Sequence, residues 1–407
     1  MIIQYQGFEK WINVALQNMR IGIKKKYILS KLQCKIVIKQ INNVLTNKRY
    51  MPNISNIPIS IKNEYLQAID KYFVNNIKLI QTFIKNEYLP HCLDEGGLSF
   101  LPNGKKEYQY LINYYTTLNN FTPEKIHKLG LDEVKRITEE LNNVKNKFNY
   151  EGNLKQFNDY MVNNPNNYYK TSTEIINAFE KIRTVINKTI MPKYFNLKIN
   201  YEYDIKSIPS YLSHYSTTAY YMMAPHDNSR KGTLYLDSNN IKSFPIYEIK
   251  TLSLHEGNPG HHFQLTYSID KKIPKLFLYI MDSTAYVEGW GLYCESFINK
   301  DDYFNEYGRL NYEMIRAVRL VIDTGIHYYG WSYQKAYDYY EKHCISYKKE
   351  THNEILRYIQ SPGQAISYKI GEIFIKNLRD EYLKKNNDIK AFHKDFLKDG
   401  ALPLCFM

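Results

Sequence analysis

The amino-acid sequence predicts a mainly α-helical protein with one short β segment. Apolar residues recur at steps of three and four along most of the chain, whereas a single region rich in tyrosine and threonine breaks that pattern. Hydrophobic residues make up 44% of the chain and aromatic residues 15%, so there is enough apolar surface for a sizeable core. We therefore expect a folded, globular, helical protein.

The clearest helical pattern covers residues 122–148. Thr122 is a good N-cap and Pro123 suits the first helical turn. Apolar side chains then recur along one face, at Ile126, Leu129, Val134, Ile137, Leu141, Val144 and Phe148. Similar patterns predict helices over about residues 62–87, 171–190, 246–256, 279–299, 303–328, 346–360 and 364–383.

The β segment is expected over about residues 198–238. Its second part, "YLSHYSTTAYYMMAPHDNSRKGTLYLDS", has strong turn signals in "PHDNSRKG" and predicts a small hairpin or two short strands. The chain has no Pro-rich or Gly/Ser-rich linker and no internal repeat. We therefore expect residues 1–407 to form a single domain rather than separable ones.

The net charge of +13 makes nucleic acid a legitimate partner to consider. The basic residues are spread along the chain, however, and no arginine cluster, zinc finger or aromatic-basic pattern accompanies them. No specific nucleic acid is therefore expected, and a nucleic-acid-binding protein remains the third-ranked hypothesis. Salt-dependent binding would be its signature.

The cysteines and the N-terminus indicate the compartment. The five cysteines are odd in number, far apart in sequence and never spaced as C-x-x-C, which argues against a disulfide framework or a thiolate zinc site. The N-terminal "MIIQYQGFEKW" lacks a signal-peptide pattern, and no stretch approaches 18 uninterrupted apolar residues. A reducing cytoplasm without a membrane span is the simplest expectation.

The stretch "TLSLHEGNPGHHFQL", residues 251–265, carries the candidate chemistry. A hydrolytic zinc site needs about three protein ligands, an open position for water and a carboxylate to take the water's proton. In the H-E-x-x-H arrangement the two histidines share one helix face and the glutamate points at the water. Here His261 and His262 follow His255 by six and seven residues, so the spacing is longer.

An unbroken helix would not bring these histidines to one ion. Seven residues would separate two side chains by roughly 10 Å along the helix axis. Pro259 removes a backbone donor, and Gly257 and Gly260 loosen the chain, so the sequence predicts a bulge between two helical segments. Spacing leaves both later histidines open, although reading the motif as H-E-x-x-H with two extra residues favours His261 over His262.

A third ligand is expected from "AYVEGWGLYCE", within metal-site helices over about residues 246–299. It offers Glu288 and Glu295 on one helix. Glu288 is favoured as the ligand because Gly289 and Gly291 allow another helix to approach closely. Glu295 would then contact a metal ligand and fix its orientation. The competing interpretation is a polar loop, since 11 histidines will place some His-Glu pair near another histidine by chance.

Several segments, taken together, resemble the bacterial peptidase-like proteins catalogued as domain of unknown function 885. The matching segments keep the family's order, and the resemblance covers nearly the whole chain. They include "YLPHCLDEGGLSFLPNGKKEYQYLINYYTT", "TPEKIHKLGLDEVKRI", "TLSLHEGNPGHHFQ", "AYVEGWGLYCE", "RAVRLVIDTGIH", "RYIQSPGQAISYKIG" and "FHKDFLKDGALPL".

This family is similar to the gluzincin metallopeptidases, which include the thimet-type oligopeptidases and angiotensin-converting enzyme. The resemblance implies a helical body around a deep cleft, with a short β segment along one wall. It also implies Zn²⁺ as cofactor. By motif, the metal ligands would be His255, His261 and Glu288, and the general base would be Glu256. The hydroxyl groups of Tyr358 and Tyr368 would donate hydrogen bonds to the developing oxyanion.

Other matching positions suggest roles in binding substrate. His262 would face the substrate or support the ligands. Arg319 and His327 would hold a substrate carboxylate, while an i,i+4 ion pair between Arg319 and Asp323 is an equal alternative. The hairpin would bind peptide by strand addition with Arg230 near the ligand, or would merely cap the helical body.

We therefore predict a zinc-dependent peptidase of carboxypeptidase or dipeptidase type that acts on short peptides. A catalytically inactive scaffold or binding protein of the same fold is the alternative. The sequence predicts no oligomeric state.

Overall fold

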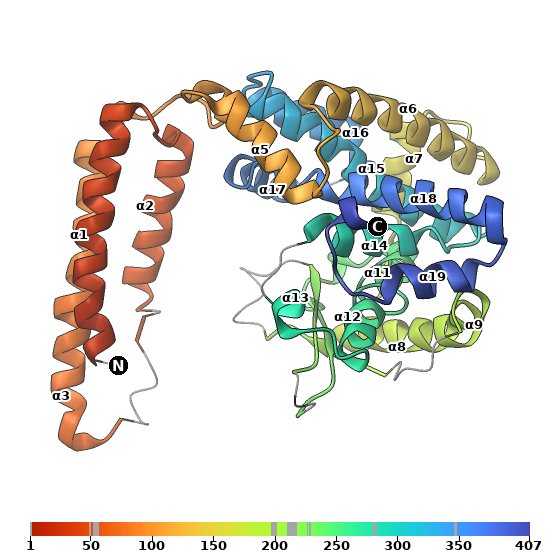
Figure 1. The fold of residues 1–407 in the computed structure, drawn as a ribbon, viewed down its shortest axis with the longest axis horizontal. Coiled ribbons are helices and arrows are strands. Elements are labelled where there is room, and N and C mark those ends of the chain that lie inside the picture. Colours follow the sequence, from red (N-terminus) through yellow and green to blue (C-terminus); the bar gives the residue numbers. More distant parts are fainter. Residues whose placement is uncertain are drawn as a thin grey trace. The chain divides into compact units, whose positions relative to one another are not determined.

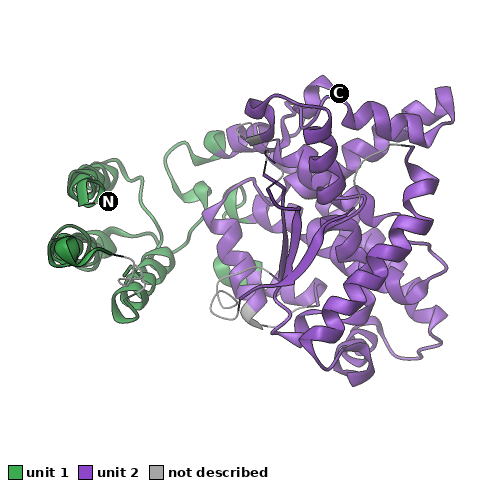
Figure 2. Cartoon of the chain, turned by 90° about the horizontal axis from the view of Figure 1, so that it is seen from below, with its two compact units in different colours: residues 1–107, 326–336 green, residues 108–325, 337–407 purple. Residues whose placement is uncertain are grey.

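The computed structural model describes residues 2–48, 50–51, 57–196, 202–209, 218–225, 227, 229–279, 283–345 and 348–407. It is mainly helical with a small sheet, as the sequence predicts (Figure 1). The chain divides into two compact units, residues 1–107 with 326–336 and residues 108–325 with 337–407 (Figure 2). The expectation that both belong to a single domain stays a prediction.

The first unit is built from amphipathic helices. Ser30 starts α2 with a capping box, in which its hydroxyl accepts from the Gln33 N–H and the Gln33 side chain reaches back. The predicted helix over 62–87 is present as α-helical segments interrupted by π-helical turns. The elements are α1 (Ile2–Lys25), α2 (Lys31–Thr46), α3 (Ile59–Ala68), a π turn (Ile69–Val74), α4 (Asn75–Phe83), a second π turn (Ile84–Tyr88), and short 3₁₀ turns at Leu89–His91 and Leu98–Phe100.

The core of this unit contains two of the five cysteines. Apolar residues of α1, α2 and the following segments pack together, at Ile12, Leu16, Cys34, Phe83, Ile84, Tyr88 and Cys92. Cys34 and Cys92 are 58 residues apart in sequence, yet their Sγ atoms lie 3.1 Å from each other as free thiols. Distance along the sequence therefore did not indicate distance in the fold.

The second unit holds most of the predicted helices close to their expected bounds. Its helices, including those that continue from the first unit, are α5 (Gly104–Thr116), α6 (Pro123–Lys147), α7 (Leu154–Asn163), α8 (Ser172–Thr189), α9 (Met191–Tyr194), α11 (Ile246–Glu256), α12 (His261–Asp270), α13 (Lys275–Tyr279), α14 (Thr284–Glu295), α15 (Tyr303–His327), α16 (Tyr333–His343), α17 (Lys348–Gln360), α18 (Ser367–Asn386) and α19 (Ile389–Leu397). Short 3₁₀ turns lie at Pro165–Asn167, Ile241–Ser243 and Leu404–Phe406.

The sheet contains the predicted hairpin and one further strand. β2 (Ala219–Met222) pairs antiparallel with β3 (Thr233–Leu236), and β1 (Asp204–Ser207) pairs parallel with β3 on its other side. Among the strands that the structure describes, β2 therefore lies at one side of the sheet. Residues 198–201, 210–217, 226 and 228 of the predicted β segment lie outside the described residues.

Helices α8 and α11 pack against this sheet. They share a hydrophobic core with the strands, formed by residues such as Ile175, Phe179, Ile205, Leu234, Phe244 and Leu252. Because α11 leads directly into the "HEGNPGHH" segment, this packing fixes the end of α11 relative to β2.

Helices α14 and α18 cross at two glycines. A Cβ added at Gly289 would lie 2.5 Å from the carbonyl carbon of Gly371, and one added at Gly371 would collide with the Ala285 carbonyl oxygen. Only glycine permits so close an approach. The crossing brings the start of α18 beside Glu288 of α14.

Candidate metal centre

The "HEGNPGHH" segment forms a break between two helices, as the sequence predicts. α11 ends at Glu256 and α12 begins at His261. A Cβ added at Gly260 would collide with the His255 carbonyl oxygen, so this tight turn requires glycine. Trp290 of α14 also stabilises the turn, because its indole N–H donates to the Pro259 carbonyl oxygen at 2.8 Å.

The turn places His255 and His261 beside Glu288. One donor atom from each of the three side chains lies within 4.8 Å of the other two. Each imidazole Nε2 is 3.5 Å from the same carboxylate oxygen, Glu288 Oε2. The two rings are nearly perpendicular, at 87°, with centroids 4.8 Å apart. Two imidazoles and one carboxylate are a donor set suited to Zn²⁺.

Another glycine makes room for the first of these histidines. A Cβ added at Gly291 of α14 would lie 2.8–3.0 Å from three atoms of the His255 ring. The ring thus packs directly against the α14 backbone, one turn from Glu288. This contact is the close helix approach that the flanking glycines predict.

The electrostatics of the three groups are strongly coupled. Burial lowers the pKa of His255, but hydrogen bonds to Glu288 and Glu295 outweigh burial and raise it to about 9. Burial raises the pKa of Glu288, yet both histidines outweigh that effect and hold it well below its usual range. The His255 imidazole therefore favours its protonated form at neutral pH. A metal ligand imidazole must be neutral, so metal binding would release a proton here.

Behind His255 lies a buried carboxylate. Glu295 is 1% exposed, and its Oε1 is 2.7 Å from His255 Nδ1. This bond directs the other ring nitrogen, Nε2, towards Glu288. Arg316 of α15 approaches the same Glu295 oxygen at 3.4 Å. By contrast, His261 Nδ1 is buried with no hydrogen-bond partner in the described part of the chain.

Glu256 and His262 both contact β2. Glu256 Oε2 accepts from the Tyr221 backbone N–H at 2.9 Å. His262 is buried, with Nδ1 2.8 Å from the Tyr221 hydroxyl and its ring packed on Tyr203 at 4.6 Å between centroids. Hence the structure brings His261, and not His262, into the donor cluster with Glu288.

The two tyrosines expected near the site have different surroundings. Tyr358 of α17 is completely buried, and its hydroxyl donates to Glu354 Oε2 at 2.6 Å. Tyr368 lies in the first turn of α18, and its hydroxyl accepts a hydrogen bond from Arg357 Nη2 at 3.1 Å. Burial and the charge of nearby Glu288 raise the pKa of Tyr368, so its hydroxyl stays protonated at neutral pH. Of the two tyrosines, Tyr368 is therefore the better placed to donate a hydrogen bond near Glu288.

The alternative ion pair between Arg319 and Asp323 is wrong. Arg319 Nη2 pairs with Glu354 Oε2 on α17 at 3.1 Å. Asp323 instead accepts hydrogen bonds from the Tyr108 hydroxyl at 2.5 Å and the Gly363 N–H at 3.0 Å. The i,i+4 rule describes isolated helices, whereas both residues of buried α15 find stronger partners on other helices.

The remaining two predicted residues are not among the members of the donor cluster. His327 is completely buried and belongs to the first compact unit, where its Nδ1 accepts from the Leu98 N–H at 3.1 Å. Arg230 is exposed between β2 and β3, and its Nη1 donates to the Lys231 carbonyl at 3.2 Å.

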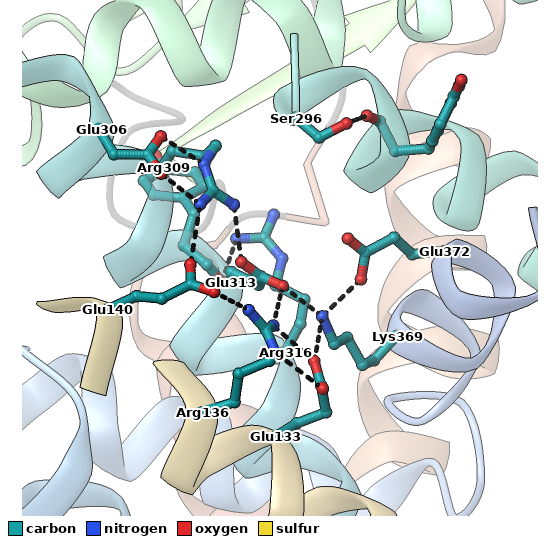
Figure 3. Close-up of polar contacts among 12 residues, drawn as sticks. Glu133, Arg136, Glu140, Ser296, Glu306, Arg309, Glu313, Arg316, Lys369 and Glu372 are labelled. Atoms are coloured by element: carbon teal, nitrogen blue, oxygen red, sulfur yellow. Dashed lines mark hydrogen bonds and ion pairs between the residues drawn. The ribbon is translucent and has the colours of Figure 1, made fainter. Parts of the chain in front are cut away.

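A buried charge network joins α6, α15 and α18 (Figure 3). On α15, Arg309 pairs with Glu306 at 2.6 Å and with Glu313 at 2.7 Å. Lys369 of α18 is 1% exposed and pairs with Glu313 at 2.6 Å, and also with Glu372 and Glu133. Each buried charge has an opposite partner, so removing one would leave the others uncompensated.

Sequence reasoning missed several residues that complete the site. Trp290 lies inside the "EGWG" segment and was within reach of a sequence argument. Tyr221, Arg316 and Arg357 lie within segments quoted above, and Glu354 lies one helical turn before Tyr358, but no sequence pattern indicated the partners that these residues contact.

Comparison with known proteins identifies the family and the fold. Residues 1–407 match the model of "Bacterial protein of unknown function (DUF885)". A "putative lipoprotein" from Colwellia psychrerythraea is similar in structure, with a TM-score of 0.90 and 25% identity over 99% of this chain and 73% of that one. A "putative lipoprotein of unknown function" from Shewanella oneidensis has a TM-score of 0.69 and 16% identity, over 93% and 72% of the two chains.

Two searches gave negative results. No curated protein matches the chain. Within the described residues, no helix combines the length and apolar character needed to cross a membrane. The match over the whole length is nevertheless decisive: the chain belongs to the DUF885 family of bacterial proteins.

Proposed function

We propose that this protein is a zinc-dependent peptidase that hydrolyses short peptides. The observation that carries the proposal is the donor cluster of His255, His261 and Glu288, with Glu256 adjacent in sequence to the first ligand. The bond from Glu295 to His255 Nδ1 adds the outer support that histidine ligands of zinc usually have. The likeness of this family to gluzincin metallopeptidases is part of the same proposal.

The residues of the chain divide the work of peptide hydrolysis. His255, His261 and Glu288 would hold the ion. When bound, Zn²⁺ would lower the pKa of a water molecule and polarise the substrate carbonyl. Glu256 would take the proton of the attacking water on its carboxylate and return it to the leaving amine.

Two further contacts suit this division of roles. The Tyr221 N–H holds Glu256 Oε2 and so orients the carboxylate. The Tyr368 hydroxyl, protonated at neutral pH, would donate a hydrogen bond to the carbonyl oxygen as negative charge develops there.

We propose that the peptide backbone binds along β2, on the side that faces Glu256. Tyr221 is opposite Leu234 of β3 in the sheet, yet its N–H points to Glu256 on the other side. This side of the strand therefore runs beside the proposed catalytic base. An extended peptide that pairs with this side would present its backbone to Glu256.

The proposed reaction is tested by Glu256→Gln in zinc-reconstituted protein. We expect the wild type to cleave members of a short-peptide library, and the variant to retain zinc but lose hydrolysis, because glutamine cannot take the proton. Glu139→Gln, an exposed carboxylate on α6, is the matched control. Unchanged hydrolysis in Glu256→Gln would refute the mechanism.

An inactive scaffold of the same fold is the alternative. It predicts wild-type protein that neither cleaves the library nor retains zinc. The same experiment therefore separates the two hypotheses.

The compartment of the reaction is part of the proposal. A cytoplasmic location is proposed, whereas each of the two structural neighbours is named a "putative lipoprotein". Fractionation of the native host, with immunodetection of the chain, decides between a cytoplasmic and an envelope location. Detection only in the envelope fraction would contradict the cytoplasmic expectation.

A further inference from the structure

Two arginines flank the ring of Tyr368. The guanidinium carbon of Arg319 lies 4.7 Å from the ring centroid, and that of Arg357 lies 5.6 Å from it. Arg357 also donates through Nη2 to the Tyr368 hydroxyl at 3.1 Å and to Gln364 Oε1 at 2.7 Å. Cations stacked on an aromatic ring lose part of their hydration and keep a fixed orientation.

These two arginines share a single carboxylate. Glu354 is 3.1 Å from Arg319 Nη2 and 3.5 Å from Arg357 Nη1. Burial raises the pKa of Glu354, but the two positive charges outweigh burial and lower it to about 2, so this carboxylate is ionised at neutral pH. Among the described ion pairs of this cluster, two guanidinium groups therefore share one carboxylate.

Arg319 also has a donor without an acceptor. Its side chain is 8% exposed, and its Nε and Nη2 donate to Tyr358 and Glu354. Its remaining nitrogen, Nη1, is buried and has no hydrogen-bond partner in the ranges that the structure covers. A buried charged donor without a partner is costly, so an acceptor from outside the chain is the simplest explanation.

The cluster lies next to the candidate metal centre. Tyr368 precedes Gly371 by three residues on α18, and Gly371 contacts Gly289, the residue after Glu288 on α14. Tyr368 and Glu288 are thus both within one helical turn of the same crossing point. An anion held by the arginines would lie beside the reaction site.

We propose that Arg319 and Arg357, held against the Tyr368 ring, form a site for a carboxylate of the peptide substrate. This inference rests on the proposed function and gives it a substrate class, peptides that carry a carboxylate near the cleaved bond. Guanidinium N–H groups match the geometry of a carboxylate, which makes this ligand a better fit than a neutral amide. The carboxylate comes from the peptide's C-terminus or from an acidic side chain.

Binding of uncleaved peptides tests the site without relying on turnover. The probes are hexa-alanine with a free C-terminus, the same peptide amidated, and amidated peptides with glutamate or glutamine at the penultimate position. Affinities are measured by calorimetry with full-length, zinc-reconstituted Glu256→Gln protein. A charge-assisted hydrogen bond predicts roughly 10- to 100-fold tighter binding of a carboxylate probe than of its neutral match.

The variants identify the residues responsible. Arg357→Ala should remove most of the preference for the carboxylate, and Arg357→Lys should keep part of it, because lysine retains charge but not the planar donor pair. Arg357 is suited to substitution because its side chain is 35% exposed. Arg20→Ala, which removes a paired arginine of the first unit, is the control and should keep the full preference.

Each outcome decides the inference. Preference for free over amidated hexa-alanine assigns the C-terminal carboxylate, and preference for glutamate over glutamine assigns an acidic side chain. Equal affinities within each pair, no binding of any probe, or an undiminished preference in Arg357→Ala would overturn the carboxylate site. If the Glu256→Gln protein binds the carboxylate probes selectively but the wild type cleaves none of them, the peptidase proposal is refuted and the carboxylate site is retained.

Discussion

Glu295→Gln tests whether the buried carboxylate behind His255 holds that imidazole for a metal. Glutamine has nearly the same shape and keeps an oxygen that can accept from Nδ1–H, so the substitution removes mainly the charge. The affected bond is short, at 2.7 Å, and Glu295 is almost completely buried. The loss of charge should therefore be felt fully at the imidazole, with little screening by solvent.

The expected magnitude follows from this role. Substituting an outer partner of a metal ligand typically lowers metal affinity roughly 10- to 100-fold, which is about 1.4–2.7 kcal/mol. Arg316, at 3.4 Å, would also lose its carboxylate partner, so the free energy of unfolding should fall as well.

Competition with a chromophoric chelator at constant pH measures the zinc affinity of wild type, Glu295→Gln and the exposed control Glu139→Gln. Circular dichroism reports whether the variant is folded at the assay temperature. A folded Glu295→Gln protein with wild-type zinc affinity would refute the role assigned to this carboxylate.

Three further predictions concern zinc binding and the stability of the fold. Gly291→Ala should displace the His255 ring, since its Cβ would lie 2.8 Å from Cε1, and chelator competition should show weaker zinc binding, unlike Gly7→Ala, where nothing lies within 4 Å. Lys369→Met should lower the free energy of unfolding in urea by about 3 kcal/mol, because Glu313 loses a buried partner; a change below about 0.5 kcal/mol would contradict this. Burial raises the pKa of Asp323 from 3.8 to about 7, so its contribution to stability is present at low pH and is lost as pH rises through about 7. In urea unfolding, Asp323→Asn should reduce the fall in the free energy of unfolding between about pH 4 and pH 7. An unchanged dependence of this free energy on pH would argue against a raised pKa of Asp323.

Local patterns predicted most of the helices and part of the site. The break after Glu256 follows from Gly257, Pro259 and Gly260, which lie within the segment itself. The roles of Gly289 and Gly291 as contact points also followed from their place beside Glu288. In each case the cause and its effect lie within a few residues of sequence.

Features that depend on distant segments could not be predicted. The i,i+4 spacing suggested Asp323 as the partner of Arg319, but the partner is Glu354 of another helix. β1 pairs parallel with β3, although β1 lies outside the hairpin that β2 and β3 form.

The choice between the two later histidines also depended on the fold. Spacing left both open, because the backbone path through the turn determines which ring faces Glu288. His261 meets that carboxylate, whereas His262 turns to the Tyr221 hydroxyl of β2.

The central claim is that His255, His261 and Glu288 bind one zinc ion. Elemental analysis of tag-free protein, wild type against His261→Ala and His262→Ala, tests it most directly. We predict one zinc per chain in the wild type and in His262→Ala, and none in His261→Ala. No zinc in wild-type protein after reconstitution, or loss of zinc only in His262→Ala, would contradict the account.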